Sequence, residues 1–163
     1  MLIASKNYGL ILPEHFKFHV SELVCNHTYS RFGEKAWMFI PQASIDFLHW
    51  FRTSIKRPII INNYNAIRPG NETQSGLRCA ACPLVMNKAK KGIPYMTAHL
   101  EGRAWDPRVI GMTTKEVHRW FEENIEKIPC NIRLEKDVPH IHVDLYTGLN
   151  ETERIVYFSP KTT

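Results

Sequence analysis

Two short segments, about forty residues apart, carry the side chains of this chain that are best suited to chemistry. The first reads HLEGRAWD from His99 to Asp106, and the second reads HIHVD from His140 to Asp144. Imidazole nitrogens and carboxylate oxygens are common zinc ligands, and a catalytic zinc keeps three protein ligands and one open position for water. The two segments therefore indicate metal-assisted hydrolysis.

The second segment has the alternation of a strand. Side chains two positions apart on a strand point to the same face. His140, His142 and Asp144 are then expected on one face, and the intervening apolar residues in the core. A four-coordinate zinc with an open position cannot accept both neighbouring histidines together with His99 and Asp106. One histidine of the pair is therefore predicted as a ligand, and the other as a supporting or acid/base group. The alternative is a row of surface histidines on a half-exposed strand.

The order of these motifs resembles a known family. The pattern His99-x-x-Gly102-x-Ala104-x-Asp106, followed by a strand with His142, is similar to the zinc D-Ala-D-Ala peptidases and to the Hedgehog signalling domain. The upstream Ser75-Gly76-Leu77-Arg78 resembles the Ser-Gly-Tyr-Arg segment of bacterial and phage peptidases of this group. The resemblance extends in matching order from about Ser75 to Tyr146.

The resemblance implies a role for each matching position. His99, Asp106 and His142 would hold one catalytic zinc ion. Arg78 would face the substrate carbonyl, where a fixed positive charge stabilises the oxyanion that develops in the transition state. Thr97 occupies the position of a serine that contacts the peptide. Two alternatives stay open, namely Arg78 as a surface ion-pair residue and Thr97 as a residue that only holds the turn before His99.

The general base is the position at which this chain departs from the family pattern. Many members carry Glu or Asp three residues before the last ligand histidine, and that position here is Pro139. His140 is the first substitute, because an imidazole with its ordinary pKa suits proton transfer at neutral pH. Asp137 is the second and Glu135 the third.

Two functions follow from the resemblance. The first is a zinc peptidase that cuts bonds involving D-amino acids in bacterial peptidoglycan, as a carboxypeptidase or an endopeptidase, with a phage lytic enzyme as one form. The second is a non-catalytic, zinc-stabilised binding module of Hedgehog-like fold. Pro139 favours the binding module, whereas Arg78 and the hydroxyl of Thr97 favour the peptidase.

The composition restricts the partners and the location. The chain has 163 residues with a formal net charge of +5, which suits one domain (1–163) and an anionic partner. Lys and Arg are scattered, and no nucleic-acid-binding motif is recognised, so nucleic acid is not expected. No apolar run approaches about 18 residues, so no membrane span is predicted. The start lacks a basic region, so no signal peptide is expected. The prediction is synthesis in the cytoplasm and action at the cell wall or on a virion.

The elements that must position these motifs are mixed. Apolar spacing predicts helices over 42–56 and 113–126, the latter beginning with a capping box at Thr113. Residues 16–20 alternate like an extended segment, with Ser21 as a possible cap. Strands are predicted at 59–61, 131–135, 141–146 and 154–158, and a long polar loop at 62–74. Helices early and short strands late favour an α+β fold, with a small antiparallel sheet and flanking helices.

Four cysteines lie outside these motifs, at Cys25, Cys79, Cys82 and Cys130. Without a secretion signal they are expected to be reduced. The spacing of Cys79 and Cys82 also allows a second metal site with the other two cysteines, but one Cys-x-x-Cys motif is a weak signal. Buried or loosely exposed thiols are therefore the main prediction.

Overall fold

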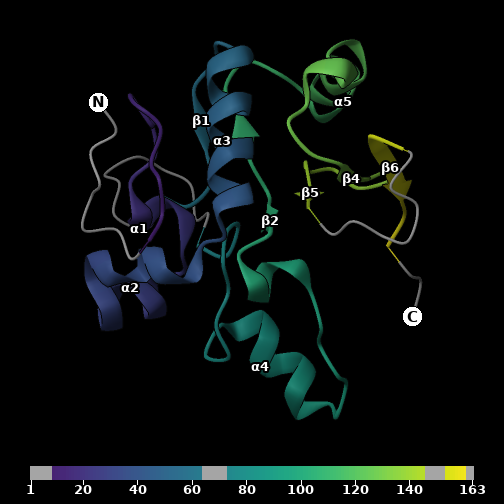
Figure 1. Cartoon of the computed structure of the whole chain (residues 1–163). Coiled ribbons are helices and arrows are strands. Elements are labelled where there is room, and N and C mark those ends of the chain that lie inside the picture. The colour runs from purple at the N-terminus through teal and green to yellow at the C-terminus, as the bar shows by residue number, and fades with distance from the viewer. Residues whose placement is uncertain (1–8, 64–72, 146–152, 161–163) are drawn as a thin grey trace.

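The computed structural model describes residues 9–63, 73–145 and 153–160. Figure 1 shows its mixture of helices with short strands. The α-helices are α1 (Val20–Leu23), α2 (Asn26–Phe32), α3 (Gln42–Ser54), α4 (Pro83–Lys90) and α5 (Thr114–Glu123). The 3₁₀ helices are η1 (Gly33–Phe39), η2 (Ala98–Glu101) and η3 (Ile125–Lys127). The strands are β1 (Ile59–Ile60), β2 (Ala104–Trp105), β3 (Arg108–Val109), β4 (Ile132–Glu135), β5 (Val143–Asp144) and β6 (Ile155–Phe158).

The described strands form two small sheets. β1 pairs with β3, and the larger sheet has the order β2-β5-β4-β6. The pairings of β1 with β3, β2 with β5, and β5 with β4 are antiparallel, whereas β6 runs parallel to β4. The chain thus has the predicted α+β class with small antiparallel sheets. The parallel pairing of β6 with β4 differs from the predicted antiparallel sheet.

Most predicted elements are present and shorter than predicted. The helix over 113–126 becomes α5 followed by η3, and Thr113 with Glu116 forms the expected capping box. At α1 the cap is His19 rather than Ser21, because the His19 ring accepts from the Ser21 backbone N–H. Helices α2 and α4 were not predicted, since neither has a strong apolar repeat. Most of the predicted loop 62–74, and the end of the strand predicted at 141–146, lie outside the described residues.

The main core lies where α3 and α5 pack together. Phe121 of α5 stacks on two α3 rings, with centroid separations of 4.8 Å to Phe51 and 6.2 Å to Phe47. Trp50 and Trp120 cover the edge of this cluster at 5.4 Å from each other. Burial of large aromatic rings contributes strongly to stability. This core fixes α5, and it also explains Trp50 and Trp120 as packing residues.

The expected alternation before and along β5 is present. Ile141, Val143 and Leu145 are buried in the core, while His140 is exposed and His142 lies at intermediate depth. Trp105 of β2 is fully buried and packs in the same core rather than lining a groove. The apolar side chains therefore anchor the segment that presents His142.

A backbone contact ties the N-terminal helices to the segment before Arg78. Val24 and Leu77 form an isolated parallel bridge, with Leu77 N–H donating to Leu23 O and Cys25 N–H donating to Leu77 O, both at 2.9 Å. Gly76 allows this approach, because a Cβ at that position would lie 2.3 Å from Leu23 O.

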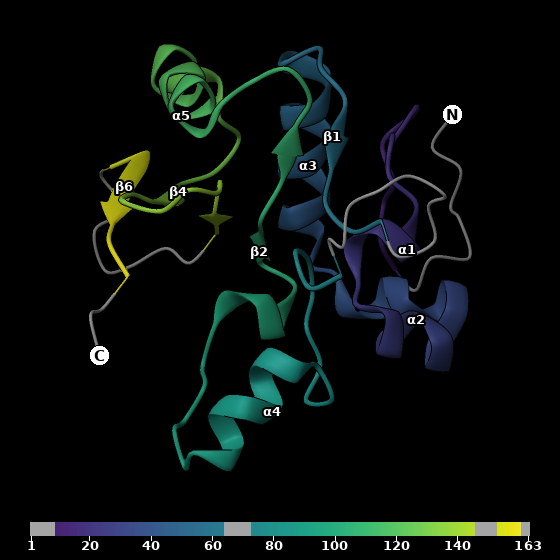
Figure 2. The ribbon, with the colours of Figure 1, turned by 180° about the vertical axis from the view of Figure 1, so that it is seen from behind.

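Figure 2 shows α1 and α2 on one side of β2, with α4 below them. Among the described residues, no helix combines the length and apolar character needed to cross a membrane.

Candidate metal centre

A tight turn places His99 in the interior. Thr97 caps η2, and its hydroxyl lies 3.5 Å from His99 N. Gly102 ends the turn with a φ of 65°, a conformation that suits glycine. A side chain there would also collide with the backbone, because a Cβ would lie 2.7 Å from Phe39 O. The turn leaves His99 only 1% exposed.

Strand register brings Asp106 and His142 together. In the β2–β5 ladder, Ala104 pairs with Asp144 and Trp105 pairs with Val143. Continuing this register by one position sets Asp106 opposite His142. Two residues that are distant in sequence are therefore placed by a short antiparallel pairing.

The three residues predicted as ligands meet with donor atoms facing one another. His142 Nδ1 lies 2.7 Å from Asp106 Oδ1, and His99 Nε2 lies 3.3 Å from both His142 Nδ1 and Asp106 Oδ1. Zinc bonds of about 2.0–2.1 Å in a tetrahedron separate neighbouring ligand atoms by roughly 3.3–3.4 Å. The spacing of this His/Asp group therefore fits one zinc ion after a small opening of the His142–Asp106 contact.

The second nitrogen of each imidazole has a fixed partner. His99 Nδ1 lies 2.8 Å from the carbonyl oxygen of Gly76, and His142 Nε2 lies 3.2 Å from Asp144 Oδ2. Asp144 is 1% exposed and also accepts two hydrogen bonds from Arg133, at 2.9 and 2.8 Å. Acceptors in these positions favour the tautomers that direct His99 Nε2 and His142 Nδ1 to the shared point. The donor set and its supports therefore suit a metal.

The electrostatics of the His/Asp group are strongly coupled. Burial alone would raise the pKa of Asp106, but hydrogen bonds with His142 and His99 outweigh it and hold that pKa below its usual range. Burial opposes protonation of His142, yet Asp106 and Asp144 raise its pKa to about 9. Burial lowers the pKa of His99. A metal ion that binds this group would displace the proton of His142 and would be attracted by the negative charge of Asp106.

Arg78 belongs to the centre and is not a surface ion-pair residue. It is 8% exposed, and its Nη2 donates to Asp106 Oδ2 at 2.8 Å. Nε also donates to Gln74 O at 2.6 Å, and Nη1 donates to Tyr95 Oη at 2.9 Å. The guanidinium thus orients the carboxylate oxygen that does not face the histidines. Sequence reasoning missed Tyr95, for which no motif gives a signal.

The His/Asp group opens on a broad cleft of about 2000 Å³. Thr97, Arg78 and Tyr95 line one part of it, and the segment from Glu135 to His142 lines another. Thr97 caps the turn before His99 and also borders the cleft, and its contact with a peptide stays a prediction. In Figures 1 and 2, α4 and α5 lie at opposite ends, with β2 passing between them.

The candidate bases border the same cleft in different states. His140 is half-exposed, with its side chain 53% accessible and Nε2 3.8 Å from Glu135 Oε2. Asp137 accepts a hydrogen bond of 2.6 Å from Ser159 Oγ and has a φ of 65°. Pro139 also lines the cleft. The short hydrogen bond from Ser159 makes Asp137 less available than His140, and His140 stays the first prediction.

Comparison with protein-family models, curated proteins and solved structures finds no match to this chain. The arrangement of the His/Asp group is therefore the basis for a functional argument.

The four cysteines do not form one group, as the alternative of a four-cysteine metal site required. Cys25, Cys79 and Cys82 lie with His27 in a second group of potential ligands. Cys130 is not a member; it packs against the main core, where burial raises the pKa of its thiol to about 11. The Cys25-x-His27 spacing was the sequence signal that could have identified His27.

Proposed function

We propose that this chain is a zinc-dependent peptidase that hydrolyses peptide bonds involving D-amino acids in bacterial peptidoglycan, as a carboxypeptidase or endopeptidase. The observation that carries the metal chemistry is the meeting of His99, Asp106 and His142 at the wall of an open cleft, with their ligand atoms 2.7–3.3 Å apart. The D-amino-acid substrate comes from the resemblance of the two motifs. A phage lytic enzyme, made in the cytoplasm and acting at the wall or from a virion, is the form proposed.

The residues of the centre divide the work. Zinc in the His/Asp group would polarise the scissile carbonyl and activate a water molecule. Arg78 fixes Asp106 through the 2.8 Å hydrogen bond, and its positive charge lies at the edge of the cleft, where an oxyanion would be stabilised. Asp144 holds His142 in one orientation, which limits the reorganisation needed during reaction.

Proton transfer is assigned to the segment before His142. The Nε2 atom of His140 would accept a proton from the attacking water and then donate it to the leaving amine. Glu135 lies 3.8 Å from Nε2 of His140, at the same wall of the cleft. Asp137 is the alternative base, and it would have to give up its hydrogen bond with Ser159.

The charge around the cleft supports an anionic substrate. Lys88, Lys115 and Lys136 border it from three different segments. Peptidoglycan stems carry free carboxylates, and lysines on the rim attract such groups over distances of about the Debye length, 8–10 Å. The apolar side chains of Ile93, Met96 and Met112 line the same cleft and provide contact area for a peptide.

The test is digestion of purified peptidoglycan by zinc-loaded protein, with released fragments identified by mass spectrometry. The expected result is a defined set of peptide fragments, whose masses name the bond. His99→Ala should release none, whereas His15→Ala, which changes an exposed histidine 3.4 Å from Glu14, should match the unsubstituted protein. Fragments that persist in the His99→Ala reaction would contradict zinc catalysis.

A zinc-stabilised binding module is the second candidate function. It is favoured by Pro139 at the usual position of the base. For this function, the zinc-loaded protein would co-sediment with cell-wall sacculi and release no fragments from several wall types. Retention in the pellet without cleavage therefore selects the binding module, and cleavage selects the peptidase.

A further inference from the structure

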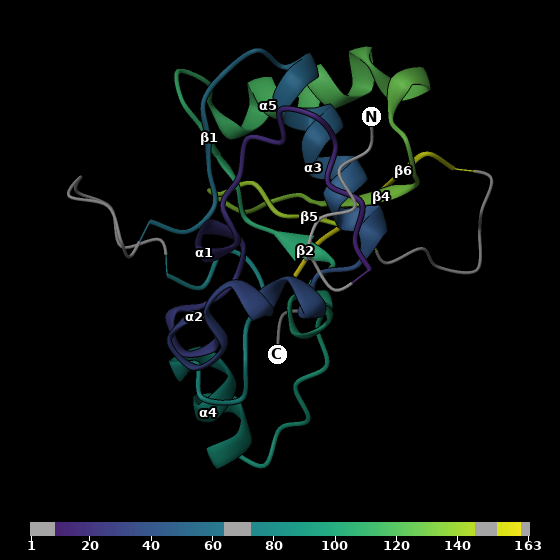
Figure 3. The ribbon, with the colours of Figure 1, turned by 60° about the vertical axis from the view of Figure 1, so that its left-hand side comes forward.

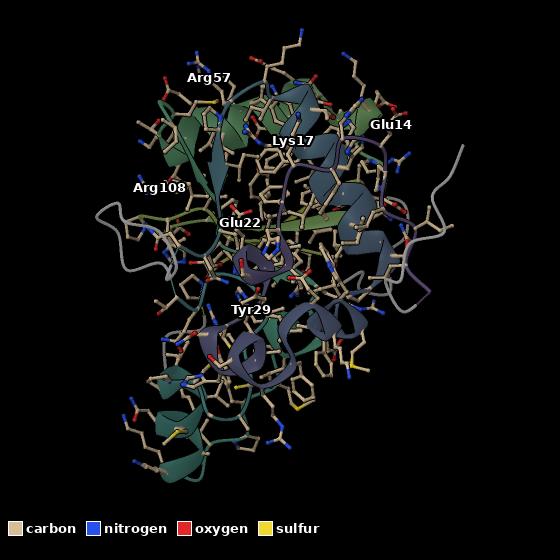
Figure 4. All side chains as sticks on the ribbon, turned by 90° about the vertical axis from the view of Figure 1, so that its left-hand side faces the viewer. Glu14, Lys17, Glu22, Tyr29, Arg57 and Arg108 are labelled. Atoms are coloured by element: carbon tan, nitrogen blue, oxygen red, sulfur yellow. The ribbon has the colours of Figure 1, made fainter. Side chains whose placement is uncertain are left out.

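A second group of ligand side chains lies where α2 meets the start of α4. Its members, here the Cys/His group, are Cys25, His27, Cys79 and Cys82. Figure 3 and Figure 4 both show α2 directly beside α4, and Figure 4 labels Tyr29 on α2 and Glu22 on the neighbouring α1. The group is separate from the His/Asp group and shares no residue with it.

Backbone hydrogen bonds bring the members of this group together. Cys25 precedes α2, and its N–H donates to Leu77 O at 2.9 Å, which brings it beside the segment that continues to Cys79. Cys82 precedes α4, and a turn closed by Cys82 N–H donating to Cys79 O at 3.0 Å folds the two cysteines toward each other. The N–H of Cys79 also points to Cys82 Sγ at 3.4 Å. Such an N–H contact stabilises a thiolate.

The distances suit a four-coordinate metal. Cys79 Sγ lies 4.0 Å from Cys82 Sγ, and Cys82 Sγ lies 3.8 Å from His27 Nδ1. All four ligand atoms lie within 4.8 Å of one another. Zinc–sulfur bonds of about 2.3 Å in a tetrahedron place neighbouring sulfurs roughly 3.8 Å apart. The group needs only a contraction of the longest separation.

One of the thiols also has a hydroxyl neighbour. Cys25 Sγ lies 3.2 Å from Thr28 Oγ1, and the Thr28 hydroxyl can donate a hydrogen bond to a Cys25 thiolate. A 2+ ion would displace the remaining thiol protons and offset most of the negative charge of the three thiolates.

The ligand chemistry selects the metal and the kind of site. Three thiolates and one imidazole prefer zinc to hard cations such as magnesium or calcium. Four protein ligands leave no open position for water, which is the arrangement of structural zinc sites. We propose that the Cys/His group binds one zinc ion as a closed structural site. This inference does not depend on the proposed peptidase activity.

The Cys/His group lies next to the segment that supports the His/Asp group. Cys79 directly follows Arg78, and the preceding Gly76 supplies the carbonyl that holds His99. Zinc bound by Cys25 and Cys79 would add a second link between these segments beside the Val24–Leu77 bridge. This link would restrain the residues Gly76 and Arg78. The structural zinc would therefore stabilise the segment from Gly76 to Arg78, which contacts His99 and Asp106.

The test is zinc content by mass spectrometry of protein purified with zinc under reducing conditions. The unsubstituted protein should hold two ions per chain, and His99→Ala should hold one. Cys82→Ser and His27→Ala should each lose the other ion, whereas the matched variant Cys130→Ser should keep two. Zinc content that is unchanged in both Cys82→Ser and His27→Ala would overturn the proposal.

Cobalt substitution identifies the ligands by their spectrum. Cobalt-loaded His99→Ala should show thiolate-to-cobalt charge-transfer absorption, and cobalt-loaded Cys82→Ser should lose it. Absence of this absorption from the His99→Ala protein would contradict a thiolate site, whatever happens at the His/Asp group. Loss of activity in His99→Ala with the absorption intact would separate the two metal sites.

A titration keeps the proposal testable if Cys82→Ser does not fold. In the folded double variant His99→Ala/Cys130→Ser, a mercurial reagent should release one zinc as three thiols react. Thiols that react without releasing zinc would refute the site. A disulfide between Cys79 and Cys82 in the protein as purified would refute it too, since sulfurs bonded at about 2.05 Å are no longer available as thiolate ligands.

Discussion

Arg78 and Asp106 form a buried ion pair in which one carboxylate oxygen contacts the guanidinium at 2.8 Å and the other contacts His142 at 2.7 Å. Asp106 is thereby held between a fixed cation and the position of the metal. A carboxylate held in this way loses little freedom when it binds zinc. The pair thus makes the geometry of the His/Asp group depend on a residue that is not itself a ligand.

Arg78→Ala should weaken zinc binding at the His/Asp group by about 10- to 100-fold, because Asp106 loses the partner that orients it. Competition with a chromogenic chelator measures the change. Arg103→Ala is the matched control, since that half-exposed arginine lies 3.8 Å from Glu101 and outside the centre. Unchanged zinc affinity with lost cleavage would assign Arg78 to the substrate instead.

Asp144→Asn should lower both zinc affinity and stability. The variant leaves Arg133 and His142 beside a neutral side chain, and breaking a buried ion pair costs about 3 kcal/mol. Urea unfolding of the metal-free protein measures the stability change. Asp46→Asn, an exposed position hydrogen-bonded to Gln42, should shift the midpoint very little. Equal shifts in the two variants would show that Asp144 has no special role.

His140→Gln should reduce kcat for peptidoglycan cleavage by about 10²- to 10⁴-fold, which is the usual contribution of a general base. Its zinc content should stay the same, because His140 is not in the His/Asp group. Asp137→Asn provides the comparison at the same cleft. If Asp137→Asn loses activity and His140→Gln keeps it, the base is Asp137.

Gly76→Ala should destabilise the protein by about 1–3 kcal/mol, the usual cost of forcing extra atoms into a packed site. The new Cβ would meet Leu23 O at 2.3 Å and force the Val24–Leu77 bridge apart. Gly92→Ala is the control, because its surroundings are open and only its φ of 66° opposes a side chain. Chemical denaturation of both variants should rank Gly76→Ala as the less stable.

Thr113→Ala should lower the free energy of unfolding by about 1 kcal/mol, the typical contribution of a helix N-cap. The Thr113 hydroxyl accepts from Glu116 N, and the Glu116 carboxylate accepts from Thr113 N at 2.7 Å. Thermal unfolding monitored by circular dichroism detects this change. Thr53→Ala, near the end of α3, should lie within about 0.5 kcal/mol of the unsubstituted protein.

Local patterns were sufficient for the parts of the fold that depend on near neighbours. The α5 capping box and the alternation of Ile141, Val143 and Leu145 both follow from contacts within a few residues. The grouping of His99, Asp106 and His142 was predicted through the family resemblance, and the structure brings the three together. Their role as zinc ligands stays a prediction.

Contacts between distant segments were beyond the reach of the sequence. His27 joins Cys82 only because the Val24–Leu77 bridge aligns two segments that lie far apart in the chain. The weaker sequence-based alternative, a site formed by the four cysteines, therefore included Cys130, which packs against the main core, and did not include His27. The parallel pairing of β4 with β6 is another contact between distant segments, and its direction cannot be predicted from the residues of either strand alone.

The pairing of Ala104 with Asp144 and of Trp105 with Val143 makes the centre independent of the length of chain between the two strands. Asp106 and His142 meet because of the register of this strand pairing, although thirty-five residues separate them in the chain. A slip of one residue, by contrast, would turn His142 into the core and expose Ile141. Metal binding thus reports whether these two strands have paired in the correct register.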